Sequence, residues 1–167
     1  MDFFNFFYIA IQNQKMSQLN GEYPCTMDAK GRLIIPAALK KQLSKAAKNS
    51  FFINRGFEKC CILYPSNEWA TTVEDINKLS DYIKREREFK RYFLRGAHKL
   101  SMDTSSRILL PKQLQDYAEI KVDVVLLAYG NKIEIWSQKQ YDKMLKEQPV
   151  DFSAMAEEVM TKRRDDK

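Results

Sequence analysis

The sequence predicts an α+β fold, mainly β, built from two copies of one small unit. A ten-residue motif occurs twice, and each copy is followed by short apolar segments that end at glycine turns. A β-rich piece of this size cannot close a core alone, so the two copies are expected to pack together. The 167 residues are 44% hydrophobic and 30% charged, which is an ordinary globular composition.

The duplicated motif begins with Met-Asp and ends with proline. Residues 27–36 read MDAKGRLIIP, and residues 102–111 read MDTSSRILLP. Each copy contains Met-Asp, three variable residues, arginine, three branched aliphatic residues and proline. The aliphatic triplet predicts a short buried strand, and the proline ends that strand and begins a helix.

Each motif is expected to form a turn ahead of its strand. The carboxylates of Asp28 and Asp103 are predicted to organise the turns by accepting backbone hydrogen bonds. Gly31 supplies a positive φ in the first turn, where a side chain would be strained. The second turn has Ser106 at this position, so the sequence predicts that it is reshaped.

The rest of each unit is predicted to be a β-hairpin. The first hairpin joins residues 51–54 to 61–64, and the second joins residues 122–128 to 133–136. Each hairpin leads into a helix that starts at a serine, and Ser137 with Gln140 makes a capping-box pattern.

A helical segment is expected between the units, broken near Ser80. The following aromatic residues recur at helical spacing and are expected to belong to the core: Tyr82, Phe89, Tyr92 and Phe93.

The chain is thus predicted to have five parts. Residues 1–18 are expected to be an N-terminal extension outside the fold, with a membrane-surface or partner-binding segment as the alternative. Residues 20–66 and 95–138 are the two units, and residues 67–94 connect them. Residues 139–167 are expected to form a C-terminal helix and a mobile tail.

Several classes of function are excluded by composition and motifs. Three cysteines, two of them adjacent, suggest neither a disulfide framework nor a zinc site, and they fit a reducing cytosol. No apolar run reaches the roughly 20 residues that crossing a membrane requires. The single histidine, His98, and the absence of hydrolase and phosphate-loop motifs argue against an enzyme. No cofactor, metal or small-molecule substrate is therefore expected.

The charge of the chain favours an anionic partner. The net charge is +6 and the pI about 9.1, which fits nucleic acid but also an ordinary basic protein. Residues 16–48 contain six basic and two acidic residues, whereas residues 100–118 contain two of each. Because DNA affinity depends largely on phosphate neutralisation, the first unit is expected to contact DNA and the second to be chiefly structural.

Arg32 is the leading candidate for base recognition. Its guanidinium can bond guanine O6 and N7 together, and Lys30 suits a phosphate or a neighbouring base. The alternative is that Arg32 only pairs with Asp28 and holds the turn closed. The other candidate DNA contacts are Lys40 and Lys41, for which a solvated helix face is the alternative, and Arg107.

The two motifs, Asp28-Ala29-Lys30-Gly31-Arg32 and Asp103-Thr104-Ser105-Ser106-Arg107, resemble those of the bacterial MraZ family. Further likeness lies in Gly21-Glu22-Tyr23, Leu63-Tyr64-Pro65, Glu68-Trp69 and Gly130-Asn131-Lys132-Ile133-Glu134-Ile135-Trp136. The resemblance covers roughly residues 19–145. It implies two AbrB-like swapped-hairpin units that form a pseudo-dimeric barrel.

The same resemblance implies a sequence-specific transcriptional regulator. It would form a homo-oligomeric ring and bind double-stranded DNA at repeated boxes upstream of its own cell-division and cell-wall gene cluster. Such a protein is expected to be cytoplasmic and nucleoid-associated, with no membrane partner. The alternative is an antitoxin-like protein-interaction module of AbrB type that uses an extended tail.

Overall fold

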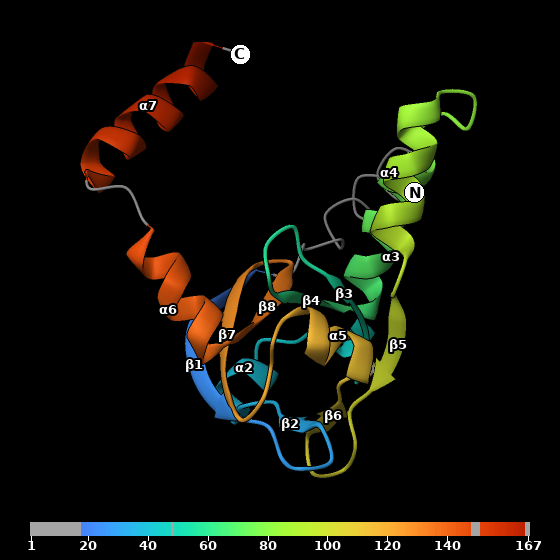
Figure 1. Ribbon diagram of the computed structural model, residues 1–167, viewed down its shortest axis with the longest axis vertical. Helices are drawn as coiled ribbons and strands as arrows, with labels where there is room; N and C mark the ends of the chain where they lie inside the picture. The colour runs from blue at the N-terminus through green and yellow to red at the C-terminus, as the bar shows by residue number, and fades with distance from the viewer. Residues whose placement is uncertain (1–17, 48, 148–150, 166–167) are drawn as a thin grey trace, which may run out of the picture.

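The strands of the fold come in two matching sets, one from each unit (Figure 1). The computed structural model describes residues 18–47, 49–147 and 151–165, so the N-terminal extension predicted for residues 1–18 lies outside the described residues except for Gln18. The first set is β1 (Leu19–Thr26), β2 (Arg32–Ile34), β3 (Ser50–Arg55) and β4 (Cys61–Pro65). The second set is β5 (His98–Ser101), β6 (Arg107–Leu109), β7 (Asp123–Gly130) and β8 (Lys132–Ser137).

The first strand of each unit pairs with the hairpin of the other unit. Hydrogen bonds order the larger antiparallel sheet as β1-β7-β8-β4-β3-β5. A separate two-stranded ribbon joins β2 to β6. The units are therefore interleaved rather than separate, and the strand order reads equivalently from both ends.

The α+β class predicted from the sequence is confirmed, but the described residues form no closed barrel. In the described part of the chain, β1 and β5 are the two edges of the larger sheet. The β2–β6 ribbon instead covers one face of this open sheet. The strand exchange satisfies the need for a partner copy because each unit completes the other's sheet.

Two clusters of buried side chains lie on opposite faces of the larger sheet. One fills the space toward the β2–β6 ribbon and includes the fully buried Leu33 and Ile108. The other is centred on the tryptophans Trp69 and Trp136. Because successive side chains of a strand point to opposite faces, both faces of each hairpin contribute to a core.

Helices and short helical turns follow the strands of both units. They are α2 (Ala37–Lys40), the 3-10 turn η1 (Lys45–Ala47), α3 (Ser66–Asn77), α4 (Lys84–Leu94), α5 (Lys112–Tyr117), α6 (Gln138–Lys146) and α7 (Phe152–Asp165). The helices α2 and α5 begin directly after Pro36 and Pro111, as the motif predicts. At the start of α6, the Ser137 hydroxyl accepts a hydrogen bond from the backbone N–H of Gln140 at 3.2 Å.

The connecting segment is two helices with a break at residues 78–83, as predicted near Ser80. The expected core role of its aromatics is wrong for three of them: Tyr82 is 97% exposed, and Phe89 and Tyr92 are exposed as well. Only one aromatic of α4 reaches the sheet deeply: Phe93 stacks on Trp69 with ring centroids 6.1 Å apart. The break releases Tyr82 from the helix face that packs.

The C-terminal region contains two helices. The second, α7, extends away from the body of the molecule (Figure 1). Residues 151–163 are all exposed. The weak patterning past Pro149 did not predict this helix.

Candidate nucleic-acid interface

Two turns of the same design project from one end of the molecule (Figure 1). In the first, the Asp28 carboxylate accepts hydrogen bonds from the backbone N–H groups of Lys30 and Arg32 at 2.9 and 3.0 Å. The same carboxylate accepts a bond from the Arg32 Nε at 2.7 Å. One aspartate thus fixes both the backbone of the turn and the direction of the arginine side chain.

The second turn repeats these contacts. The Asp103 carboxylate accepts from the backbone N–H groups of Ser105 and Arg107 at 2.8 and 2.9 Å. It also accepts from the Arg107 Nε at 2.8 Å. Arg107 is thus paired with Asp103 in the same way that Arg32 is paired with Asp28.

The reshaping expected at Ser106 does not occur. Its φ is +60°, close to the +79° of Gly31, and both residues donate a backbone hydrogen bond of 3.0 Å to the aspartate carbonyl three residues earlier. The surroundings explain why only one turn needs glycine. A Cβ on Gly31 would lie 2.5 Å from the Gln115 amide nitrogen, whereas the Ser106 hydroxyl accepts a 2.9 Å hydrogen bond from Lys40.

These contacts also show that one positive charge counted with the first unit lies at the turn of the second unit. Lys40 belongs to α2 of the first unit, but its ammonium group lies at the second turn. The residue 75 positions later, Gln115 of α5, lies at the first turn and is neutral. Each turn consequently has two cations near it. They are Lys30 and Arg32 at the first turn, and Arg107 and Lys40 at the second. Lys41, next to Lys40, is exposed at the end of α2.

The two aspartates remain charged at neutral and mildly acidic pH. The backbone N–H of Arg32 lowers the pKa of Asp28, helped by the Arg32 side chain and by Lys30. Arg107 and Ser105 lower the pKa of Asp103 in the same way. Among the described residues, no hydrogen bond engages the terminal guanidinium nitrogens of Arg32 or Arg107. Each guanidinium is thus oriented through Nε and keeps the planar fork that guanine or phosphate recognition requires.

The ribbon between the turns exposes two aliphatic side chains. Ile34 and Leu109 are each 57% exposed, whereas their strand neighbours Leu33 and Ile108 are buried. The prediction that the whole triplet is buried is therefore wrong, because a strand three residues long points alternate side chains outward. The middle position in each triplet is the signal that could have identified these residues, because a strand points that side chain away from the buried neighbours on either side.

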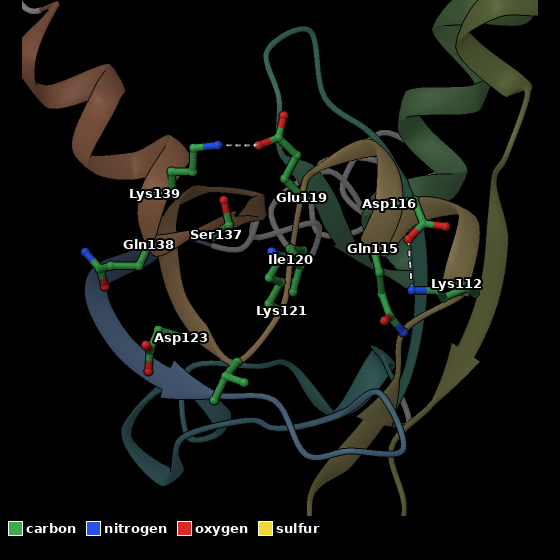
Figure 2. Close-up of a pocket in the computed structure, with 11 residues that line it drawn as sticks. Lys112, Gln115, Asp116, Glu119, Ile120, Lys121, Asp123, Ser137, Gln138 and Lys139 are labelled. Carbon is green, nitrogen blue, oxygen red and sulfur yellow. Dashed lines mark hydrogen bonds and ion pairs between the residues drawn. The ribbon is translucent and has the colours of Figure 1, made fainter.

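A hollow of about 780 Å³ between α5 and the start of α6 differs from the turns in its balance of charge (Figure 2). It is lined by three lysines and three acidic residues. Lys112 pairs with Asp116 at 2.9 Å, and Lys139 with Glu119 at 3.4 Å. Such balanced charge does not suit a polyanion, so the turns and the ribbon are the better candidate site. None of the predicted site residues lines this hollow.

The described residues hold no metal cluster and no membrane-spanning helix. No group of three or more potential metal ligands occurs there. None of the helices described is long and apolar enough to span a bilayer.

Taken together, the fold and the site define a duplicated protein whose units exchange strands and carry paired Asp–Arg turns at one end. The chain belongs to the MraZ family. The family model described as "MraZ protein, putative antitoxin-like" matches it twice, over residues 19–92 and 93–163.

Relatives named "Transcriptional regulator MraZ" align with this chain over nearly their full length. The Flavobacterium psychrophilum relative is 39% identical over 152 residues, which are 90% of this chain and 97% of the relative. The Christiangramia forsetii relative is 40% identical over 87% of this chain and 94% of its own length. The Natranaerobius thermophilus relative is 38% identical over 84% of this chain and 95% of its own length. Their shared name supports a role in transcription regulation.

Proposed function

We propose that this chain is a sequence-specific regulator that binds double-stranded DNA through its two turns and the ribbon between them. The observation that carries this proposal is the pair of arginines at one end of the molecule. Each is held through its Nε by an aspartate, and no described residue bonds its terminal guanidinium nitrogens.

The proposed roles follow from the chemistry of each side chain. Arg32 bonds guanine in the major groove, an interaction worth about 1–3 kcal/mol of discrimination. Arg107 makes the equivalent contact from the second turn. The lysines Lys30, Lys40 and Lys41 neutralise phosphates, which contributes affinity without sequence preference. Asp28, Gly31 and Asp103 hold the turns in shape.

The proposal includes assembly. The swapped-hairpin units of several chains would assemble into a homo-oligomeric ring. Such a ring would present the basic turns of several protomers to one DNA molecule. Repeated boxes upstream of the protein's own cell-division and cell-wall gene cluster would then bind with avidity, because each further contact is intramolecular. Nucleoid association would follow from this binding.

Footprinting on the DNA upstream of the protein's own gene tests the proposal. The wild-type protein is expected to protect discrete, regularly spaced boxes, and Arg32→Ala to lose them with its oligomeric size unchanged. Arg85→Ala, which removes an exposed arginine from the first turn of α4, is the matched control and should protect like wild type. Protection by Arg32→Ala equal to wild type would contradict the role of Arg32.

A salt titration separates this function from an antitoxin-like interaction module. DNA affinity should fall log-linearly as salt rises, because phosphate contacts release counterions. The exposed apolar side chains of α7 favour the alternative of a protein partner: Phe152, Met155, Val159 and Met160. Absence of any salt-dependent DNA binding, together with tight binding of a protein through α7, would support that alternative.

A further inference from the structure

The outward face of the β2–β6 ribbon carries two arginines and two aliphatic side chains in a diagonal pattern. In the antiparallel register, Arg32 lies opposite Leu109 and Ile34 lies opposite Arg107. Directly opposite residues point to the same side of the ribbon, so each arginine has an exposed aliphatic neighbour. The buried residues of the same strands, Leu33 and Ile108, anchor the ribbon to the core.

The charges around this face indicate what covers it. Lys30 lies in the first turn and Lys40 at the second, so both ends of the ribbon are basic. A second copy presenting the same face would bring like charges together. A two-stranded ribbon fits the width of the major groove of DNA, whose walls are lined by phosphates. DNA therefore matches the face in both shape and charge.

Resting on the proposed DNA-binding function, we infer that Ile34 and Leu109 contact the C5-methyl groups of thymines in the major groove. Thymine is the one standard base that presents a methyl group there, and apolar side chains recognise it by contact. The face would then read two features at once. Its arginines would select guanines, and its aliphatic residues would select thymines beside them.

The contact can be tested with DNA that lacks the methyl group but keeps every hydrogen-bonding atom. The duplex upstream of the protein's own gene is prepared with thymidine or with deoxyuridine throughout, and the dissociation constants are measured at one salt concentration. Wild type is expected to bind the deoxyuridine duplex more weakly, by about fourfold for each thymine methyl group that Ile34 or Leu109 would bury. Ile34→Ala and Leu109→Ala should weaken binding to the thymidine duplex by a similar factor, yet bind the deoxyuridine duplex like wild type.

Two control variants show whether an effect is specific to the methyl contact. Leu145→Ala removes an exposed leucine from α6, away from the ribbon in Figure 1, and should match wild type on both duplexes. Arg32→Ala should weaken binding to both duplexes by the same factor, since its partner atoms are present in each. Circular dichroism and size-exclusion chromatography confirm that each variant keeps its fold and assembly.

The outcomes distinguish this inference from the function on which it rests. Equal binding of wild type to the two duplexes would overturn the methyl contact while leaving DNA binding intact. An equal loss for Ile34→Ala on both duplexes would overturn the methyl contact, because the lost contact would then be to DNA atoms that both duplexes share. Failure to bind either duplex would overturn the proposed function and this inference with it.

Discussion

Ser106 has a left-handed backbone conformation. Gly31, the equivalent residue of the first unit, adopts the same conformation without strain. The Ser106 side chain is tolerated because the residue facing it is the flexible Lys40 rather than Gln115, whose amide nitrogen bonds the Leu110 carbonyl at 2.7 Å. The two copies have therefore diverged in pairs: glycine faces glutamine at one turn, and serine faces lysine at the other.

Ser106→Gly is expected to stabilise the protein. Glycine relieves the strain of a positive φ, and the larger freedom of the unfolded chain offsets part of this gain, so the free energy of unfolding should rise by about 0.5 kcal/mol. Urea denaturation measures the change. The neighbour Ser105 has no positive φ, so Ser105→Gly is the matched control and should lower stability instead. A gain of equal size in both variants would exclude strain as its cause.

At the scale of elements, α6 and α7 differ sharply in how they attach. On α6, Tyr141 is only 4% exposed, packs against Trp136 and donates a 2.7 Å hydrogen bond to Glu22 of β1. This burial, together with the bond to Glu22, raises the pKa of Tyr141 to about 12. By contrast, α7 has an exposed surface along residues 151–163.

Removal of α7 should therefore leave the fold unchanged. A chain ending at Glu147 is expected to keep its free energy of unfolding within about 0.5 kcal/mol of the full chain, as substitutions on open surface do. A chain ending at Ser137 also loses Tyr141 and should be destabilised by about 3–5 kcal/mol, the usual cost of deleting a buried aromatic side chain. Thermal and urea denaturation of both chains check this. A large loss from the shorter deletion would mean that α7 packs against the body.

At the scale of the whole molecule, strand exchange makes the two units depend on each other. β1 finds its hydrogen-bonding partner in β7, and β2 finds its partner in β6. A fragment of residues 18–94 is expected to fold only as a dimer or with the complementary fragment 95–147. Amide dispersion in NMR spectra and sedimentation equilibrium test this. A folded monomer of 18–94 would contradict it.

Much of this fold could be predicted from the sequence, because local signals specify local elements. The doubled motif predicted the turns and the helices after Pro36 and Pro111, and the apolar segments with their glycine turns predicted the hairpins. What could not be predicted were contacts between the units. The position of Lys40 beside Ser106 depends on which strand pairs with which, and charge counted along the chain cannot show it. The exposure of Ile34 and Leu109 was missed because an aliphatic triplet has the same composition whether two or all three of its side chains are buried.

The interleaved units also bear on the symmetry of any DNA target. A true homodimer presents identical halves, so its operator tends toward a palindrome. Here one gene encodes both halves, and the halves already differ, since Lys30 corresponds to Ser105 and Lys40 to Gln115. Because the two halves differ, they need not recognise DNA with two-fold rotational symmetry, and a box of the proposed kind is free to be directional, with a distinct left and right end.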